Sequence, residues 1–162
     1  MQKGFATFEV IFVTFIIVVL ISVAIPNANH MIDMVALDYE TKSIYTDLKF
    51  LQSLDRMTDM KDSHFSTNDD GNQITLVVYP EQYIFKKFST SKIYDEHYFS
   101  HGVTASQKGG RENWQIKFDD MGKVSPAESN NLKLNSQFGK NAKIVFDSVG
   151  RIRGERGNEQ TE

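Results

Sequence analysis

Histidine and acidic side chains are the residues of this chain whose types are suited to binding a metal or moving a proton. His97 and His101 lie four residues apart, directly after Asp95 and Glu96. Two histidines at this spacing on one helix can share a zinc ion with a third ligand. The segment around them lacks a helical pattern, and the sequence places no third ligand. We therefore expect exposed loop histidines here, and neither a metal nor a cofactor.

Other patterns of catalytic chemistry are missing from the sequence. The acidic pairs Asp69-Asp70 and Asp119-Asp120 stand beside glycines and are typical of turns rather than of acid–base or calcium sites. The chain has no cysteine, which excludes disulfides, thiolate nucleophiles and cysteine-bound metals. There is no phosphate loop, nucleophile elbow or zinc signature. The sequence predicts a protein that is not an enzyme.

Arginines near the C-terminus have the charge and shape to hold phosphate groups. The motif Gly-Arg-Ile-Arg occupies residues 150–153 and is followed by Arg156. If Arg151 and Arg153 lie on one strand, they point to the same side of it. Arginines on one face can bind DNA phosphates without reading the bases. The net charge of −3 and the acidic tail favour another interpretation, a charged hairpin end that keeps a sheet edge soluble.

Glu9 is the only charged residue in a long apolar run, FATFEVIFVTFIIVVLISVAI, from Phe5 to Ile25. These 21 residues span roughly 30 Å as a helix, enough to cross the core of a bilayer. A carboxylate at mid-bilayer costs up to about 3 kcal/mol, so such a residue normally has a partner. A secretory signal fits poorly, because the run is too long and lacks a small-residue cleavage site at its end. The sequence predicts a membrane-spanning segment over 5–26.

The residues around this carboxylate resemble the leader of type IV prepilins and of the pseudopilins of type II secretion and competence systems. Lys3-Gly4-Phe5 precedes Glu9, the apolar run and Pro26 in the order found in that family. The opening Phe-Ala-Thr-Phe-Glu keeps the spacing of the family's common Phe-Thr-Leu-Ile-Glu but differs from it in local identity. Each part of this short motif is thus present in the family's order.

The resemblance implies how the N-terminus is processed. Residues 1–4 would be a leader that a prepilin peptidase removes by cutting between Gly4 and Phe5, after which the amine of Phe5 is methylated. Glu9 would pair with the N-terminal amine of a neighbouring subunit. Such an amine has a pKa of about 8 and is largely cationic at neutral pH. Opposite charges attract strongly in a low dielectric, where each alone is unfavourable.

An amphipathic pattern continues beyond Pro26 and predicts that one long helix reaches to about residue 62. Pro26 is expected to kink or loosen this helix, because it removes the backbone bond to the carbonyl of Ser22. The apolar rows over 27–62 are Leu37, Ile44 and Leu51, then Met34, Thr41 and Leu48. The predicted solvent-facing residues are Glu40, Lys42, Asp47 and Lys49.

Short alternating segments predict a β-rich head over 63–154 and a flexible polar tail over 155–162. The predicted strands cover 74–79, 83–88, 98–105, 114–118 and the segment around Leu132 and Leu134. Residues 116–124 resemble residues 144–152, each with a strand, an Asp-x-x-Gly turn and a return strand. This repeat predicts two hairpins whose turn glycines have positive φ.

The combined elements predict an α+β fold, pilin-like in plan: a long N-terminal helix, transmembrane in its first half, packed on a small antiparallel β-sheet head. The second half of the chain resembles the minor pseudopilins of the GspH/FimT-like group and, in plan, the competence pseudopilin ComGD. The resemblance implies a single-pass protein of the cytoplasmic membrane with its head outside. It would then assemble with other pilin or pseudopilin subunits into a type IV pilus, a type II secretion pseudopilus or a competence pseudopilus.

Two alternatives stand beside this interpretation. In FimT-like minor pilins a Gly-Arg-x-Arg element is linked to DNA binding, so the resemblance offers DNA as a partner of Arg151, Arg153 and Arg156. DNA retention that falls with salt favours this alternative. The second alternative is a single-pass anchored binding domain that never polymerises. An uncut N-terminus, or assembly indifferent to the loss of Glu9, favours that one.

Overall fold

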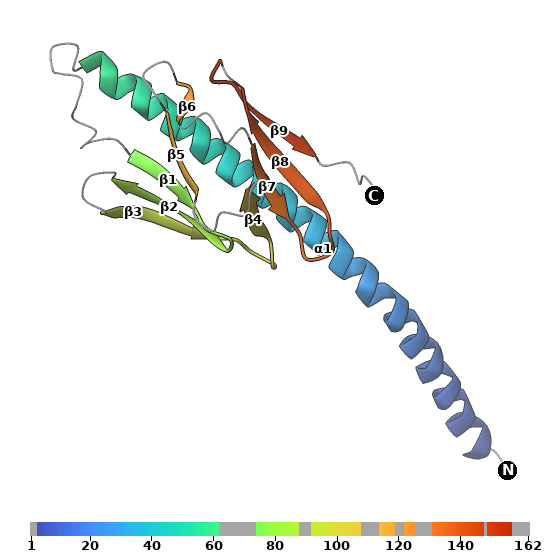
Figure 1. The fold of residues 1–162 in the computed structure, drawn as a ribbon. Helices are drawn as coiled ribbons and strands as arrows, with labels where there is room; N and C mark the ends of the chain where they lie inside the picture. Colours follow the sequence, from blue (N-terminus) through green and yellow to red (C-terminus); the bar gives the residue numbers. More distant parts are fainter. Residues whose placement is uncertain are drawn as a thin grey trace.

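The computed structural model describes residues 3–61, 74–87, 92–107, 114–118, 122–125, 131–147 and 149–156. A single helix, α1 (Lys3–Lys61), runs along the head and extends far beyond it toward the N-terminus (Figure 1). Antiparallel strands form two small sheets that pack on the C-terminal half of this helix. The predicted α+β fold, a long helix on a small antiparallel head, is confirmed.

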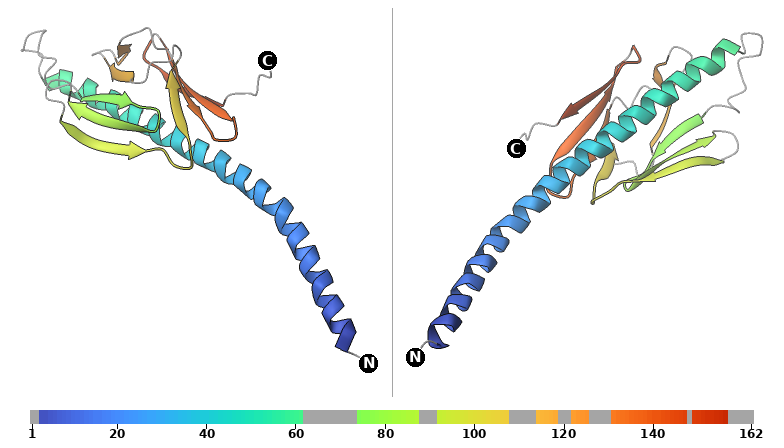
Figure 2. Two further views of the ribbon diagram at one scale, coloured as in Figure 1. Left: turned by 60° about the horizontal axis from the view of Figure 1, so that its bottom comes forward. Right: turned by 180° about the vertical axis from the view of Figure 1, so that it is seen from behind.

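The continuity of α1 follows from its sequence. No glycine occurs between Gly4 and the end of the helix, and Pro26 is the only proline inside it. The helix passes through Pro26 without ending and curves gently toward its N-terminus (Figure 2). Near this point Asn27 Nδ2 donates to the carbonyl of Val23 over 3.2 Å. The disturbance expected at Pro26 is therefore mild, since the helix continues on both sides of it.

The first sheet has the strand order β3-β2-β1-β5-β6, and every neighbouring pair is antiparallel. Its strands are β1 (Ile74–Val78), β2 (Gln82–Lys87), β3 (Ile93–Tyr98), β5 (Trp114–Phe118) and β6 (Val124–Ser125). The second sheet has the order β4-β7-β8-β9 and is also antiparallel. Its strands are β4 (Thr104–Gln107), β7 (Asn131–Asn135), β8 (Asn141–Phe146) and β9 (Ile152–Arg156).

One side of α1 is buried against both sheets. Its buried residues recur every three or four positions, which places them on one stripe of the helix. They are Asp33, Ala36, Leu37, Glu40, Ile44, Leu48, Leu51 and Gln52. The predicted row of Leu37, Ile44 and Leu51 is confirmed, while Met34 from the second row is exposed. The prediction that Glu40 faces solvent is wrong, because its side chain is only 1% exposed.

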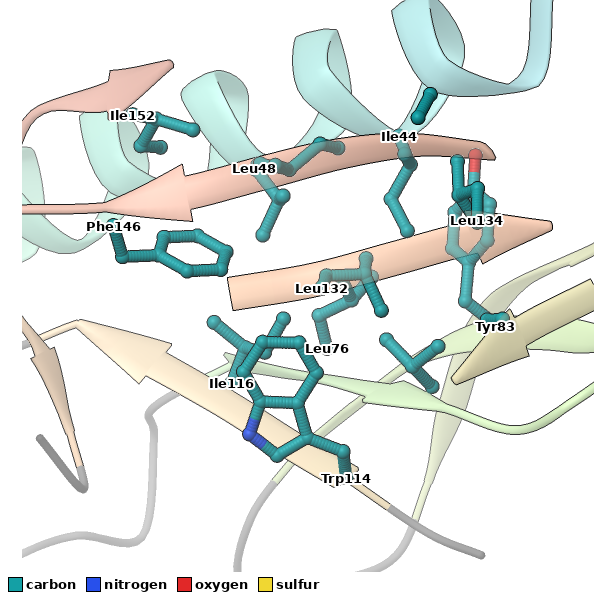
Figure 3. Packing of buried hydrophobic residues seen from close by; sticks show 14 of the residues in the cluster. Ile44, Leu48, Leu76, Tyr83, Trp114, Ile116, Leu132, Leu134, Phe146 and Ile152 are labelled. Atoms are coloured by element: carbon teal, nitrogen blue, oxygen red, sulfur yellow. The ribbon is translucent and has the colours of Figure 1, made fainter. Parts of the chain in front are cut away.

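The core fills the space between α1 and the inner faces of the two sheets (Figure 3). Leu48 from the helix lies above Phe146 of β8, whose ring meets Trp114 of β5 edge-on with centroids 5.7 Å apart. Ile116 of the first sheet and Leu132 of the second sheet complete this centre, and each is at most 1% exposed. The alternation of buried and exposed residues along β5, β7 and β8 explains why these strands were predictable.

One predicted strand, over 98–105, is wrong. This segment contains the end of β3, a turn and the start of β4. The turn is made by His101 and Gly102, whose φ angles of 50° and 70° interrupt any strand. The predicted strands at 74–79, 83–88 and 114–118 correspond to β1, β2 and β5, with Phe88 outside the described residues.

Both copies of the sequence repeat form hairpins, as predicted. The first is β5–β6 and the second is β8–β9. Their turn glycines, Gly122 and Gly150, have φ angles of 73° and 79°. Strand β9 continues through Arg156, so the polar tail begins two residues later than expected, and residues 157–162 lie outside the described part of the chain.

Candidate functional site

The N-terminal half of α1 presents an uncovered apolar surface. Every described side chain from Phe8 to Ile25 is exposed, including large ones such as Phe8, Phe12 and Leu20, each at least 58% exposed. Among the described residues, α1 is the one helix long and apolar enough to cross a membrane, with a mean hydropathy of 2.9 in its most apolar stretch. The helix is therefore compatible with a single-pass membrane anchor. Figure 1 shows that no part of the head lies against this half.

The residues predicted for processing and assembly lie at the outer end of this surface. Gly4 and Phe5 are in the first turn of α1, and Glu9 follows Phe5 by about one helical turn. The Glu9 side chain is exposed, and none of the ion pairs among the described side chains includes it. Among the described side chains, this carboxylate in an apolar setting has no cation to neutralise it.

An open groove lies where α1 enters the head, a few residues after Pro26. Its volume is about 470 Å³, and apolar side chains of the helix form its floor. The turn between β3 and β4 forms its wall. The lining residues are Ala28, Met31, Ile32, Val35, Ala36, Tyr39, Ser100 and His101. The apolar surface of α1 thus continues beyond the predicted membrane segment, up to the base of the head.

A buried carboxylate holds this wall in place. Glu40 Oε1 accepts hydrogen bonds from the backbone N–H of Ser100 over 2.9 Å and from its hydroxyl over 2.6 Å. His97 Nε2 lies 2.7 Å from Glu40 Oε2. Burial raises the pKa of Glu40, but the bonds from Ser100 and His97 outweigh burial and hold this pKa below its ordinary value. Three donors explain why a carboxylate is tolerated inside the head.

The same polar contacts correct the sequence-based interpretation of the histidines. His97 is on β3 and is bonded to Glu40, so it is not an exposed loop residue. Its ring also stacks on Tyr83, with centroids 4.9 Å apart. His101 lies in the exposed turn, on a different segment from β3. His97 therefore connects β3 to the helix through Glu40, and His101 lies in the turn that follows β3.

Tyr83 makes a second polar connection between the first sheet and α1. Its hydroxyl donates to Asp47 Oδ2 over 2.6 Å and lies 3.1 Å from the hydroxyl of Ser43. Burial and the bond to Asp47 raise the pKa of Tyr83, so the phenol stays protonated and remains a donor. Strands β2 and β3 are thus joined to the helix through hydrogen bonds as well as through apolar packing.

Gln52 joins α1 to both copies of the sequence repeat. Its Nε2 donates to the carbonyl oxygen of Gly122 over 2.7 Å and to that of Gly150 over 2.6 Å. The two turns also touch directly, because a Cβ on Gly150 would lie 2.5 Å from the carbonyl oxygen of Gly122. One buried amide therefore fixes two hairpins at once.

The candidate DNA-binding arginines lie on the outer strand β9 and just before it. Arg151 and Arg153 are exposed on either side of the buried Ile152, so they point to the same side, as expected from their spacing. The guanidinium of Arg153 donates to the carboxylate of Asp147, and this bond raises the pKa of Arg153. Arg156 is the last residue of β9, and only its backbone is described.

No model of a protein family, no curated protein and no solved structure matches this chain.

Sequence reasoning missed Glu40 and Gln52. Both lie four residues from a buried apolar position, Glu40 from Ile44 and Gln52 from Leu48. Strict helical spacing therefore contained a signal for their burial, which the charge of one side chain and the polarity of the other obscured.

Proposed function

We propose that this chain is a filament subunit of the prepilin and pseudopilin class. It is inserted in the cytoplasmic membrane with its head outside, cut by a prepilin peptidase between Gly4 and Phe5, and methylated at Phe5. It then assembles with other subunits through α1, into a type IV pilus or a secretion or competence pseudopilus. The observation that carries this proposal is the single continuous helix, bare and apolar in one half and buried in the head in the other.

The bare half of α1 requires an apolar environment outside the chain. The large side chains from Phe8 to Ile25 are 42–71% exposed, and burying such a side chain stabilises it by about 1.5–3 kcal/mol. Lipid satisfies this surface before assembly, and the helices of other subunits satisfy it afterwards. Because α1 continues without interruption from this surface into the head, it holds the head in a fixed position relative to the bare half.

Glu9 distinguishes a filament subunit from a plain anchor. An anchor gains nothing from a carboxylate on its apolar helix, which is unfavourable in lipid. A filament subunit gains a partner for the cationic amine of its neighbour. This supports an assembly role for Glu9, in which the carboxylate sets the register between helices.

The test is the substitution Glu9→Gln in the native host, with Glu81→Gln as the control on an exposed acid of the head. Because Glu9→Gln removes the partner of the neighbour's amine, we expect incorporation into sheared filaments to fall by at least about tenfold. Cleavage before Phe5 should continue, and Glu81→Gln should assemble as the parent does. Unchanged incorporation of Glu9→Gln would contradict the proposal and favour an anchored domain that does not polymerise.

The DNA alternative remains a prediction of the resemblance and is not proposed as a second function. The carboxylates of Asp147 and Glu155 lie on the same hairpin as Arg151 and Arg153. These acids reduce the positive charge that would attract phosphates. The edge strands of the head suggest a different partner for this partly neutralised pair of arginines.

A further inference from the structure

The outermost strands of the head, β3 and β9, are free on one edge. Among the described residues β3 pairs only with β2, and β9 pairs only with β8. The two strands lie on opposite flanks of the head, in Figure 1 and again from the other directions in Figure 2. A free edge exposes unpaired backbone N–H and C=O groups that can pair with another chain. Strands β6 and β4 end the same sheets on their other sides but have only two and four residues, so β3 and β9 are the two longest docking edges of the head.

The outward side chains of β3 and β9 carry complementary charges. On β3 the ring of His97 points inward to Glu40, so its neighbours Glu96 and Tyr98 point to the outer face. A register shift between β2 and β3 interrupts this alternation at Tyr94. Tyr94 is 53% exposed and Tyr98 is 63% exposed, which is unusual for residues of this size. No ion pair among the described residues includes Glu96. The β3 edge thus presents an exposed acid and two exposed aromatic rings.

The opposite edge presents a basic counterpart. Ile152 of β9 points inward to the core, so Arg151, Arg153 and Glu155 alternate on the outer face. Arg153 is 58% exposed, and its bond to Asp147 leaves other N–H donors of the guanidinium for a second carboxylate. Asp147 also orients the guanidinium on this flank.

We propose that β3 of one copy pairs with β9 of a second copy, with Glu96 opposite Arg153. Each free edge is thus occupied by the opposite edge of another copy of this chain. Both strands run toward the N-terminal side of the head (Figure 1), so copies in the same orientation pair in parallel. With Glu96 opposite Arg153, the carboxylate of one copy faces the guanidinium of the next across the new strand pair.

This contact can repeat from one copy to the next. The two edges are different surfaces on opposite flanks, so the contact is head-to-tail, and a head-to-tail contact generates rings or open helical filaments. The copies must also shift along the helix axis, because β3 is fastened at Glu40 whereas β9 starts beside Gln52. The inference rests on the proposed filament function and adds that several copies stand side by side in the filament.

The absence of cysteine from the chain makes this contact testable by disulfide formation. The test variant is the full-length chain with Glu96→Cys and Arg153→Cys, expressed in the native host in place of the parent. Cysteines directly opposite on paired strands have the separation that a disulfide needs. The matched control combines Glu96→Cys with Lys133→Cys, since Lys133 is exposed on β7, an inner strand of the same sheet as β9.

Sheared filaments of the test variant should give a ladder of dimers, trimers and higher multimers after mild oxidation, and the control should give no ladder. A processed chain that enters filaments but forms no ladder would overturn the pairing of β3 with β9 while the filament function stands. A chain that keeps Met1 and never enters filaments would overturn the filament function itself. If the ladder is missing and Arg153→Gln abolishes salt-sensitive retention of DNA, the arginines serve nucleic acid and the proposed pairing is wrong.

Discussion

Glu40 shows how a single buried carboxylate organises one side of the head. Its three hydrogen bonds reach the end of β3 and the turn after it, which forms the wall of the groove beside α1. Hydrogen bonds to a charged group are stronger than neutral ones, and removing one partner leaves the others unsatisfied. Glu40 is therefore expected to matter more for stability than any exposed acid of the chain.

The substitution Glu40→Ala should destabilise the head by about 2–4 kcal/mol, because it leaves the partly buried donors of His97 and Ser100 without an acceptor. Urea unfolding of the full chain in detergent, followed through the single tryptophan, Trp114, measures this loss. The control is Glu96→Ala, whose exposed side chain should change stability by no more than about 0.5 kcal/mol. Equal effects of the two substitutions would contradict the role assigned to Glu40.

The same carboxylate predicts a dependence of stability on acid. The folded protein holds the pKa of Glu40 below the ordinary 4.5. Its stabilising contribution is therefore complete above pH 4.5 and is lost as the pH falls through the lowered pKa of the folded state. The difference in unfolding free energy between the parent and Glu40→Gln should shrink as the pH falls below about 4. A difference that stays constant from pH 7 to pH 3 would contradict this.

Residue types alone could not have identified this site. The sequence indicated Glu40 as a solvent-facing acid, since a charged residue on an amphipathic helix is usually on its wet face. Its burial depends on the donors of Ser100 and His97, which are far away along the chain and arrive only with the turn after β3. By contrast, the common side of Arg151 and Arg153 followed from strand geometry and was predictable.

Among the elements, the two repeat hairpins were predicted and their contact with each other was not. The Asp-x-x-Gly pattern indicates a turn wherever it occurs, so both hairpins were recognisable locally. The packing of one turn on the other depends on how the two sheets meet at α1. Gln52 marks this meeting point by bonding to Gly122 and Gly150.

The turn contact can be tested at Gly150, with Gly139 as a matched control. Both glycines have a φ near 80°, so alanine at either site brings a backbone cost of about 1–2 kcal/mol. A Cβ on Gly150 would also lie 2.5 Å from the carbonyl oxygen of Gly122, whereas a Cβ on Gly139 meets open space. Gly150→Ala should therefore lower the unfolding free energy by at least about 2 kcal/mol more than Gly139→Ala. Equal losses would contradict the contact.

The buried stripe of α1 gives a further prediction. Leu48 is fully buried between the sheets, and Phe50, two residues on, is 62% exposed. Leu48→Ala should cost about 2–5 kcal/mol in urea unfolding, because the surrounding side chains refill the cavity only in part. Phe50→Ala should change the unfolding free energy by less than about 1 kcal/mol. Similar losses would mean that the helix packs through another face.

At the scale of the whole molecule, the predictable features were those set by the spacing of apolar residues along the chain. An apolar run followed by an amphipathic pattern predicted one helix with two environments, and α1 has both. The order of the strands in two sheets was not predictable, because long-range pairing between alternating segments leaves no local trace. The positions of the free edges β3 and β9, and with them the proposed lateral contact, follow only from that order.

The whole-molecule account depends on a helix that is freed at its N-terminus before it assembles. Intact mass and N-terminal sequencing of the protein from sheared filaments and membranes of the native host test this most directly. The account predicts a chain that begins at Phe5 and carries one extra methyl group on its amine. A chain that keeps Met1, in cells that cut other prepilins, would contradict the account and leave a head anchored by a plain membrane helix.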